Sequence, residues 1–170
     1  MGRFAATAES QAAQLAGAPS GTTFNGYFFG IRSGAAANYK LRRLIIGVRA
    51  GASVPTSQQM TLQIQRQTVA CVGTGITLAS AGGNMDPSGA ASAIAGFDIT
   101  TATAAGTTGP TLTTVLHKFS FNTQSAMDIP FEFLEELYAP VGTANGLALV
   151  NIGNALPAAH LFTVSAEWEE

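Results

Sequence analysis

The residues that could carry catalysis or bind a metal are few in this chain. There are two histidines, His117 and His160, and one cysteine, Cys71. His117 falls on the apolar side of a predicted strand, which is typical of a buried core histidine, and His160 follows a proline in a predicted loop with no acid nearby. A single cysteine excludes an internal disulfide and a cysteine-based metal site, so we expect Cys71 to be a small buried hydrophobic residue. We therefore expect no metal and no cofactor.

Pairs of acidic residues offer the other possible chemistry. Asp128 and Glu132 would share a strand face, but four residues of strand span roughly 13 Å, which is too far to chelate one ion. Glu167 and Glu169 would lie roughly 7 Å apart, near the separation in an inverting glycosidase, yet Trp168 points to the opposite face. The Gly-x-Ser-x-Gly motif of a nucleophile elbow is absent. The sequence therefore predicts a protein that is not an enzyme.

Alternation of apolar and polar residues predicts the elements that would position any site. In the stretch 59–68, Met60, Leu62 and Ile64 alternate with Thr and Gln, so one face is apolar and the other is polar. This pattern is typical of a half-buried strand in an antiparallel sheet. The stretch 161–169 repeats it. Its two faces are Phe162, Val164, Ala166 and Trp168 on one side and Leu161, Thr163, Ser165 and Glu167 on the other.

Further strands complete the predicted fold class. Extended segments are expected at 22–32, 40–50, 69–79, 97–101, 111–121, 129–134 and 146–152. Asp86 and Pro87 form a helix-start signal, followed by a turn or two at most. The prediction is an all-β protein, a two-sheet antiparallel jelly-roll sandwich of eight or nine strands. Its predicted core includes Leu62, Ile64, Phe119, Phe121, Val164 and Trp168.

The first twenty residues differ from the rest. Residues 1–20 are rich in Ala, Gln and Ser, and we expect them to form an extended N-terminal arm, with the sandwich domain at 21–170. Such a segment cannot fold alone, because ordering each residue costs about 1–2 kcal/mol. An ordered arm would therefore lie on a partner. Its large apolar residues, Phe4 and Leu15, and its one cation, Arg3, are the expected contacts to that partner.

The composition indicates a covered surface. Hydrophobic residues make up 46% of the 170 residues, while charged residues make up only 11%. An average soluble domain carries roughly 25% charged residues. Exposed surface is normally kept solvated by charge, so the deficit favours an exterior that is partly covered by other chains. The 30 Ala and 19 Gly suit flat, close contacts better than a pocket.

The net charge of −2 hides an asymmetry along the chain. Residues 1–85 hold seven of the eight basic residues, and residues 86–170 hold nine of the ten acidic ones. Strands from the two halves could alternate and pair their charges locally, or the molecule could have a basic and an acidic side. No basic cluster with interleaved aromatic residues is present, so nucleic-acid binding is not expected. Neither a signal peptide nor a membrane segment is predicted, which indicates synthesis in a cytoplasm.

Several short motifs together resemble one protein family. They are the segment 62–68, Gly73-Thr74-Gly75, Met85-Asp86-Pro87, Ala90-Ala91, Phe119-Ser120-Phe121-Asn122, Asn145-Gly146-Leu147 and Glu167-Trp168-Glu169-Glu170. In this order they resemble the jelly-roll cement, or decoration, proteins of tailed bacteriophage capsids, over about residues 40–170. The resemblance implies no catalytic residues.

The resemblance implies a function in the virion. The expectation is a homotrimer that binds the major capsid protein on the outside of the shell, after synthesis in the cytoplasm of a bacterial host. The alternative is a receptor- or carbohydrate-binding jelly-roll module of a phage tail or fibre. A lectin site normally presents exposed Trp and Tyr side chains, and this chain has one Trp and three Tyr without a cluster.

Overall fold

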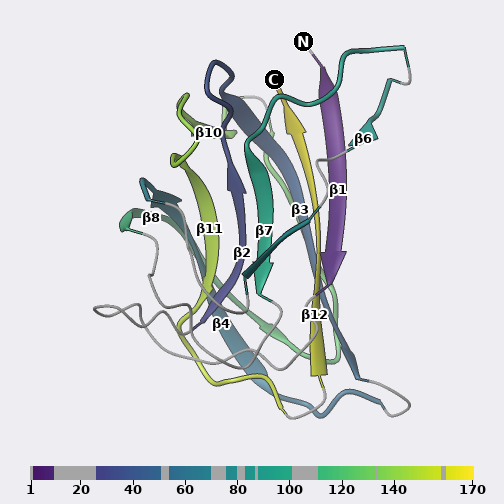
Figure 1. Cartoon of the computed structure of the whole chain (residues 1–170). Helices are drawn as coiled ribbons and strands as arrows, with labels where there is room; N and C mark the ends of the chain where they lie inside the picture. Colours follow the sequence, from purple (N-terminus) through teal and green to yellow (C-terminus); the bar gives the residue numbers. More distant parts are fainter. Residues whose placement is uncertain are drawn as a thin grey trace.

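The chain folds into two antiparallel β-sheets that pack face to face, as a computed structural model shows (Figure 1). The structure describes residues 2–9, 26–50, 54–69, 76–79, 83–86, 88–100, 111–132, 134–157 and 160–170, and of residues 76–79 and 97–100 only the backbone. These residues contain twelve strands and no helix. None of the described elements is therefore a helix that could cross a membrane.

The strands follow one another along the chain with these bounds. They are β1 (Arg3–Glu9), β2 (Tyr27–Arg32), β3 (Tyr39–Ala50), β4 (Gln59–Gln67), β5 (Ile76–Ala79), β6 (Gly83–Asn84), β7 (Gly96–Thr100), β8 (Leu112–Asn122), β9 (Met127–Pro130), β10 (Leu137–Ala139), β11 (Gly146–Asn151) and β12 (His160–Glu169).

Each sheet contains six strands. The first sheet has the order β10-β3-β12-β1-β6, with β9 also paired to β3, and the second has the order β5-β7-β2-β11-β4-β8. Four pairings nest inside one another along the chain: β1 with β12, β2 with β11, β3 with β9, and β4 with β8. The pairings of β12 with β3 and of β11 with β4 then join these four pairs into the two sheets.

The core lies between the inward faces of the two sheets. In β4 and β12, the side that the alternation predicts to be apolar faces the core. Its residues Leu62, Ile64, Val164 and Trp168 are all buried. Phe28 of the second sheet contacts Phe162 of the first, with ring centroids 4.4 Å apart. Two further residues were predicted for the core: Phe121 is buried, and Phe119 is half-buried against the core.

The N-terminal segment differs from the predicted arm. Residues 3–9 form β1, which lies between β12 and β6 within the first sheet (Figure 1). Phe4 is only 3% exposed and stacks on Trp168, with ring centroids 5.9 Å apart. The prediction of an arm is wrong for residues 3–9, because the sheet itself supplies the hydrogen bonds and the apolar cover that a partner was expected to supply. Residues 10–25, and Leu15 with them, lie outside the described residues.

Two other expected elements are also different in the structure. The strand predicted at 129–134 ends at Pro130, and Leu134 follows in a turn with φ of 74°. The helix-start signal at Asp86 instead stabilises a turn, because the Asp86 carboxylate accepts hydrogen bonds from the backbone N and the hydroxyl of Ser88. Three strands were not predicted, β1 and the short strands β6 and β10, and they raise the count to twelve, above the eight or nine strands expected.

Candidate functional site

The two histidines lie on different sheets, His117 on β8 of the second and His160 on β12 of the first. His117 was expected in the core, but it is exposed, and it makes an edge contact to Phe131, with ring centroids 5.6 Å apart. The expectation is wrong because β8 is an edge strand. His160 is not in a loop: it begins β12, is buried, and accepts a hydrogen bond from the backbone N of Thr56 over 2.9 Å. The described residues contain no group of three or more His, Cys, Asp or Glu residues that could hold a metal ion.

Opposite charges pair across the outer face of the first sheet. Arg43 binds Asp128 over 2.6 Å and Glu167 over 3.4 Å, and Arg49 binds Glu9 over 2.6 Å. The hydrogen bonds from Arg43 lower the pKa of Asp128, and those from Arg49 lower the pKa of Glu9. Strands β9 and β12 from the second half of the chain therefore lie beside β3 from the first half, and the Arg43 ion pairs join the two halves locally.

A second ion-pair group lies beside the first, around Arg42. Its guanidinium binds both Glu136 and Glu169. The two carboxylates weighed as a glycosidase pair, Glu167 and Glu169, are thus bound to different arginines. Trp168 between them is buried, and its indole N donates a hydrogen bond to Glu170 over 2.9 Å.

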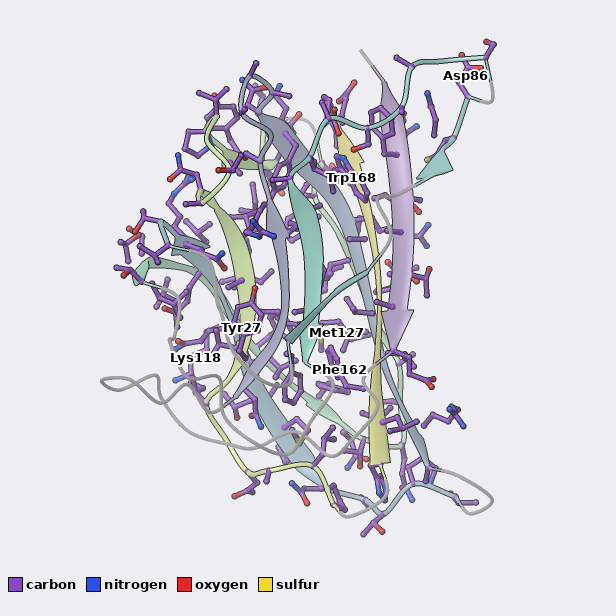
Figure 2. The ribbon with its side chains drawn as sticks, in the orientation of Figure 1. Tyr27, Asp86, Lys118, Met127, Phe162 and Trp168 are labelled. Carbon is purple, nitrogen blue, oxygen red and sulfur yellow. The ribbon has the colours of Figure 1, made fainter. Side chains whose placement is uncertain are left out.

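A hollow on the described surface lies where Gly2 and Glu170 meet. Figure 2 shows the loop of Asp86 projecting from the edge of the first sheet, close to the two ends of the chain that Figure 1 marks. The loop is attached to β1 by the short strand β6 and by a hydrogen bond from the backbone N of Met85 to the carbonyl oxygen of Arg3. Between the loop and the sheet lies a hollow of about 750 Å³, lined by Arg3, Phe4, Met85, Glu170 and the small residues of 89–93. We call this hollow the terminal hollow.

Glu170 fixes the far side of the projecting loop. Its carboxylate accepts hydrogen bonds from the hydroxyl of Ser92 and from the backbone N of Ala93. The backbone of Glu170 also exchanges two hydrogen bonds with Gly2. This contact was not predicted from the sequence. The only sequence signals near it are the motifs at 85–87 and 167–170, which contribute to the family resemblance.

The structure separates the three predicted contact residues. Arg3 is exposed and lies between the terminal hollow and a second hollow of about 390 Å³, which Arg42, Phe131 and Glu169 also line. Phe4 forms one wall of the terminal hollow, but its side chain is buried against Trp168 and is not free for the contact expected of it. Leu15 lies outside the described residues.

No family model, curated protein or solved structure matches this chain. What its surface can bind therefore follows from the chemistry of the surface. The terminal hollow is lined by one cation, Arg3, by the carboxylates Asp86 and Glu170, and by apolar atoms of Met85 and Ala90.

Proposed function

We propose that this chain is a non-enzymatic structural protein of a tailed-bacteriophage virion. In this proposal it is a trimeric cement protein that binds the major capsid protein on the outside of the shell and stabilises it. The observation that carries the proposal is the nested pairing of the strands, which supports a jelly roll.

Eight of the twelve strands form one folded ribbon. When β5, β6, β7 and β10, which lie outside the four nested pairs, are set aside, the eight remaining strands can be numbered one to eight in chain order. Their pairings are then one with eight, two with seven, three with six and four with five, which is an antiparallel ribbon folded back on itself. Rolling this ribbon gives one sheet with the order one-eight-three-six and another with two-seven-four-five, as in a double Greek key.

Jelly rolls occur in viral capsid proteins, lectins and cupins, so the surface has to distinguish them. A cupin holds a metal inside its barrel, and the described residues offer no ligand cluster for one. A lectin presents exposed aromatic platforms, whereas the one Trp and two of the three Tyr in this chain are buried. The receptor-binding alternative is therefore less well supported than a structural role in the capsid.

The terminal hollow is the proposed attachment site on the shell. A segment of the capsid protein would lie between the projecting loop and β1, against Met85 and beside Arg3. Glu170 and β6 hold the loop at both ends, so little ordering would be required on binding, which favours affinity. A cement protein acts by added buried area, and a standard interface buries about 1,600 Å² in total.

The test is addition of the purified protein to phage shells that lack it. We expect the wild-type protein to saturate the shell and to raise the temperature at which the shell releases its DNA. The double variant Arg3→Glu, Met85→Asp should show lower occupancy at limiting concentration. Val54→Asp is the matched control, because Val54 is also exposed but lies between β3 and β4, away from the hollow.

Two results would contradict the proposal. Absence of binding to any shell, with the protein found on the tail by virion imaging, would overturn the capsid role in favour of a tail module. Full occupancy of the shell by the double variant would be compatible with the capsid role, but it would show that the terminal hollow is not the attachment site.

A further inference from the structure

Large apolar side chains that are exposed to solvent gather around one end of the sandwich. The described residues contain seven of them, and five lie there: Val69, Val115, Leu134, Tyr138 and Val141. Val69 and Val115 stand at the adjoining ends of β4 and β8, and the other three stand in the connection from β9 to β11. A hydrogen bond from Arg66 of β4 to the carbonyl oxygen of Tyr138, 2.6 Å long, joins the two groups. We call these five residues the apolar end.

Leu134 is the most exposed of the five, at 82%, and it has a positive φ of 74°. A bulky residue in this left-handed region is strained, and glycine would occupy the position without that strain. The strained turn is nevertheless fixed. The backbone N of Glu135 donates to the carbonyl oxygen of Glu132, and the backbone N of Leu134 donates to the carboxylate of Glu136. Glu136 is held in turn by Arg42, so the fold presents Leu134 rigidly to the outside.

Unpaired charges of opposite sign flank this surface. Glu132 and Glu135 are exposed on either side of Leu134, and neither has an ion-pair partner among the described residues. Lys118 on β8 and Arg66 on β4 likewise lack an acidic partner in the described part of the chain. The acidic turn adjoins β8, because Phe131 at its base contacts His117 of that strand.

We propose that the apolar end is the surface through which copies of this chain associate. Leu134 of one copy, with Glu132 and Glu135 beside it, packs against Val115 and Lys118 of the next copy, which share the outer face of β8 because they lie opposite Gln65 and Gln63 of β4. A second copy is the fitting partner because each molecule carries both the acidic turn and the cation Lys118, which complement each other only between molecules. Such a contact is heterologous, and a rotation that closes it forms a ring. The inference rests on the trimer of the proposed function and names the surface that would form it.

The variant Leu134→Gly should weaken association without weakening the fold. Glycine removes the apolar contact and relieves the backbone strain, so the fold should be at least as stable against urea below the association concentration. The concentration for half-assembly, measured by light scattering, should rise about tenfold or more, as for a central contact residue. Val54→Gly is the matched control, since Val54 is 78% exposed and lies outside the apolar end. It should leave the assembly concentration unchanged.

Charge reversal tests the pairing. Lys118→Glu alone and Glu135→Lys alone should each weaken association, and the two substitutions together in one chain should restore most of it. If the wild-type protein and the Leu134→Gly variant are both fully trimeric, the apolar end is not the association surface. The proposed capsid role is unaffected by that result. A wild-type protein that stays monomeric at micromolar concentration would overturn the surface and the trimer together. Shell occupancy then still decides the capsid role on its own.

Discussion

The hydroxyl group of Tyr39, on β3 of the first sheet, donates a hydrogen bond to the carbonyl oxygen of Ile31, on β2 of the second sheet, over 2.8 Å. The same hydroxyl accepts a hydrogen bond from the backbone N of Leu147 on β11. Tyr39 is fully buried, so this one oxygen satisfies two main-chain groups of the facing sheet inside the core. Burial also raises the pKa of the Tyr39 hydroxyl, which therefore stays protonated.

Tyr39→Phe should lower the free energy of unfolding by about 1–3 kcal/mol, because it leaves buried main-chain groups without their partner. Urea unfolding at neutral pH measures the loss. Tyr138→Phe is the matched control: the Tyr138 hydroxyl only accepts a hydrogen bond from Asn38 at the surface, and its removal should cost less than about 0.5 kcal/mol. Equal losses of unfolding free energy for the two substitutions would show that the hydrogen bonds between the sheets do not contribute to stability.

Phe4→Ala should destabilise the protein by about 3–5 kcal/mol, the usual cost of truncating a buried aromatic residue. The reason is the stack of Phe4 on Trp168 inside the first sheet. Thermal unfolding with tryptophan fluorescence follows both the stability and the surroundings of Trp168. Arg3→Ala, next in sequence but exposed, should change the stability little. A Phe4→Ala protein as stable as the wild type would mean that β1 is peripheral to the fold.

Gly146→Ala should cost about 1–3 kcal/mol, because it overpacks the close approach of β11 to its neighbouring strand β2. A Cβ at this position would lie 2.1 Å from the carbonyl oxygen of Ile31 and 3.1 Å from Cα of Arg32. These are main-chain atoms of β2, which cannot move without distorting the sheet. Gly83→Ala is the control, since a Cβ there meets no atom within 4 Å. The comparison fails if both variants unfold at the same urea concentration.

Acid should weaken the fold through its ion pairs. Glu9 beside Arg49 and Asp128 beside Arg43 have pKa values below their ordinary values of 4.5 and 3.8. A carboxyl group whose pKa is lower in the folded state stabilises the fold above its ordinary pKa, and loses this contribution as the pH falls through the folded-state pKa. Stability from these pairs should therefore be constant from pH 7 to about pH 5 and decline below about pH 4.5.

Urea midpoints measured from pH 7 to pH 3 check this expectation. The double variant Glu9→Gln, Asp128→Asn should show a shallower decline, and added salt should reduce the difference, because both pairs are partly exposed. An identical pH profile for the variant would assign the acid sensitivity to other groups.

Strands with large alternating side chains could be predicted from the sequence, and strands built on small residues could not. β4 and β12 carry Leu62, Ile64, Phe162 and Trp168 on one face, which determines the face as well as the strand. β1 has one large apolar residue, Phe4, and completes its inner face with Ala, whose small side chain carries a weak signal. Hydrogen bonds to β12 keep β1 in the sheet, and these depend on residues at the opposite end of the sequence.

Alternation also predicts a face without predicting how deeply it is buried. His117 and Phe119 were assigned to the core side of β8 together with Phe121, and only Phe121 is fully buried. Burial on an edge strand depends on how far the facing sheet extends, which is a property of the assembled fold. The terminal hollow could not be predicted for the same reason, since Glu170 meets Ser92 and Ala93 only after the sandwich has formed.

The nested strand pairing has a consequence for how the protein folds. Among the four nested pairs, the innermost, β4 with β8, connects the two strands closest in sequence, and each pair outside it encloses a longer stretch of chain. Long-range pairings of this kind make folding slow, because the chain loses entropy before the contacts form. β1 has no long partner strand until β12 has been synthesised, so Phe4 stays exposed on the ribosome while the middle of the ribbon is already able to pair. Folding should therefore proceed outward from β4 and β8, and β1 should be among the last strands to join its sheet.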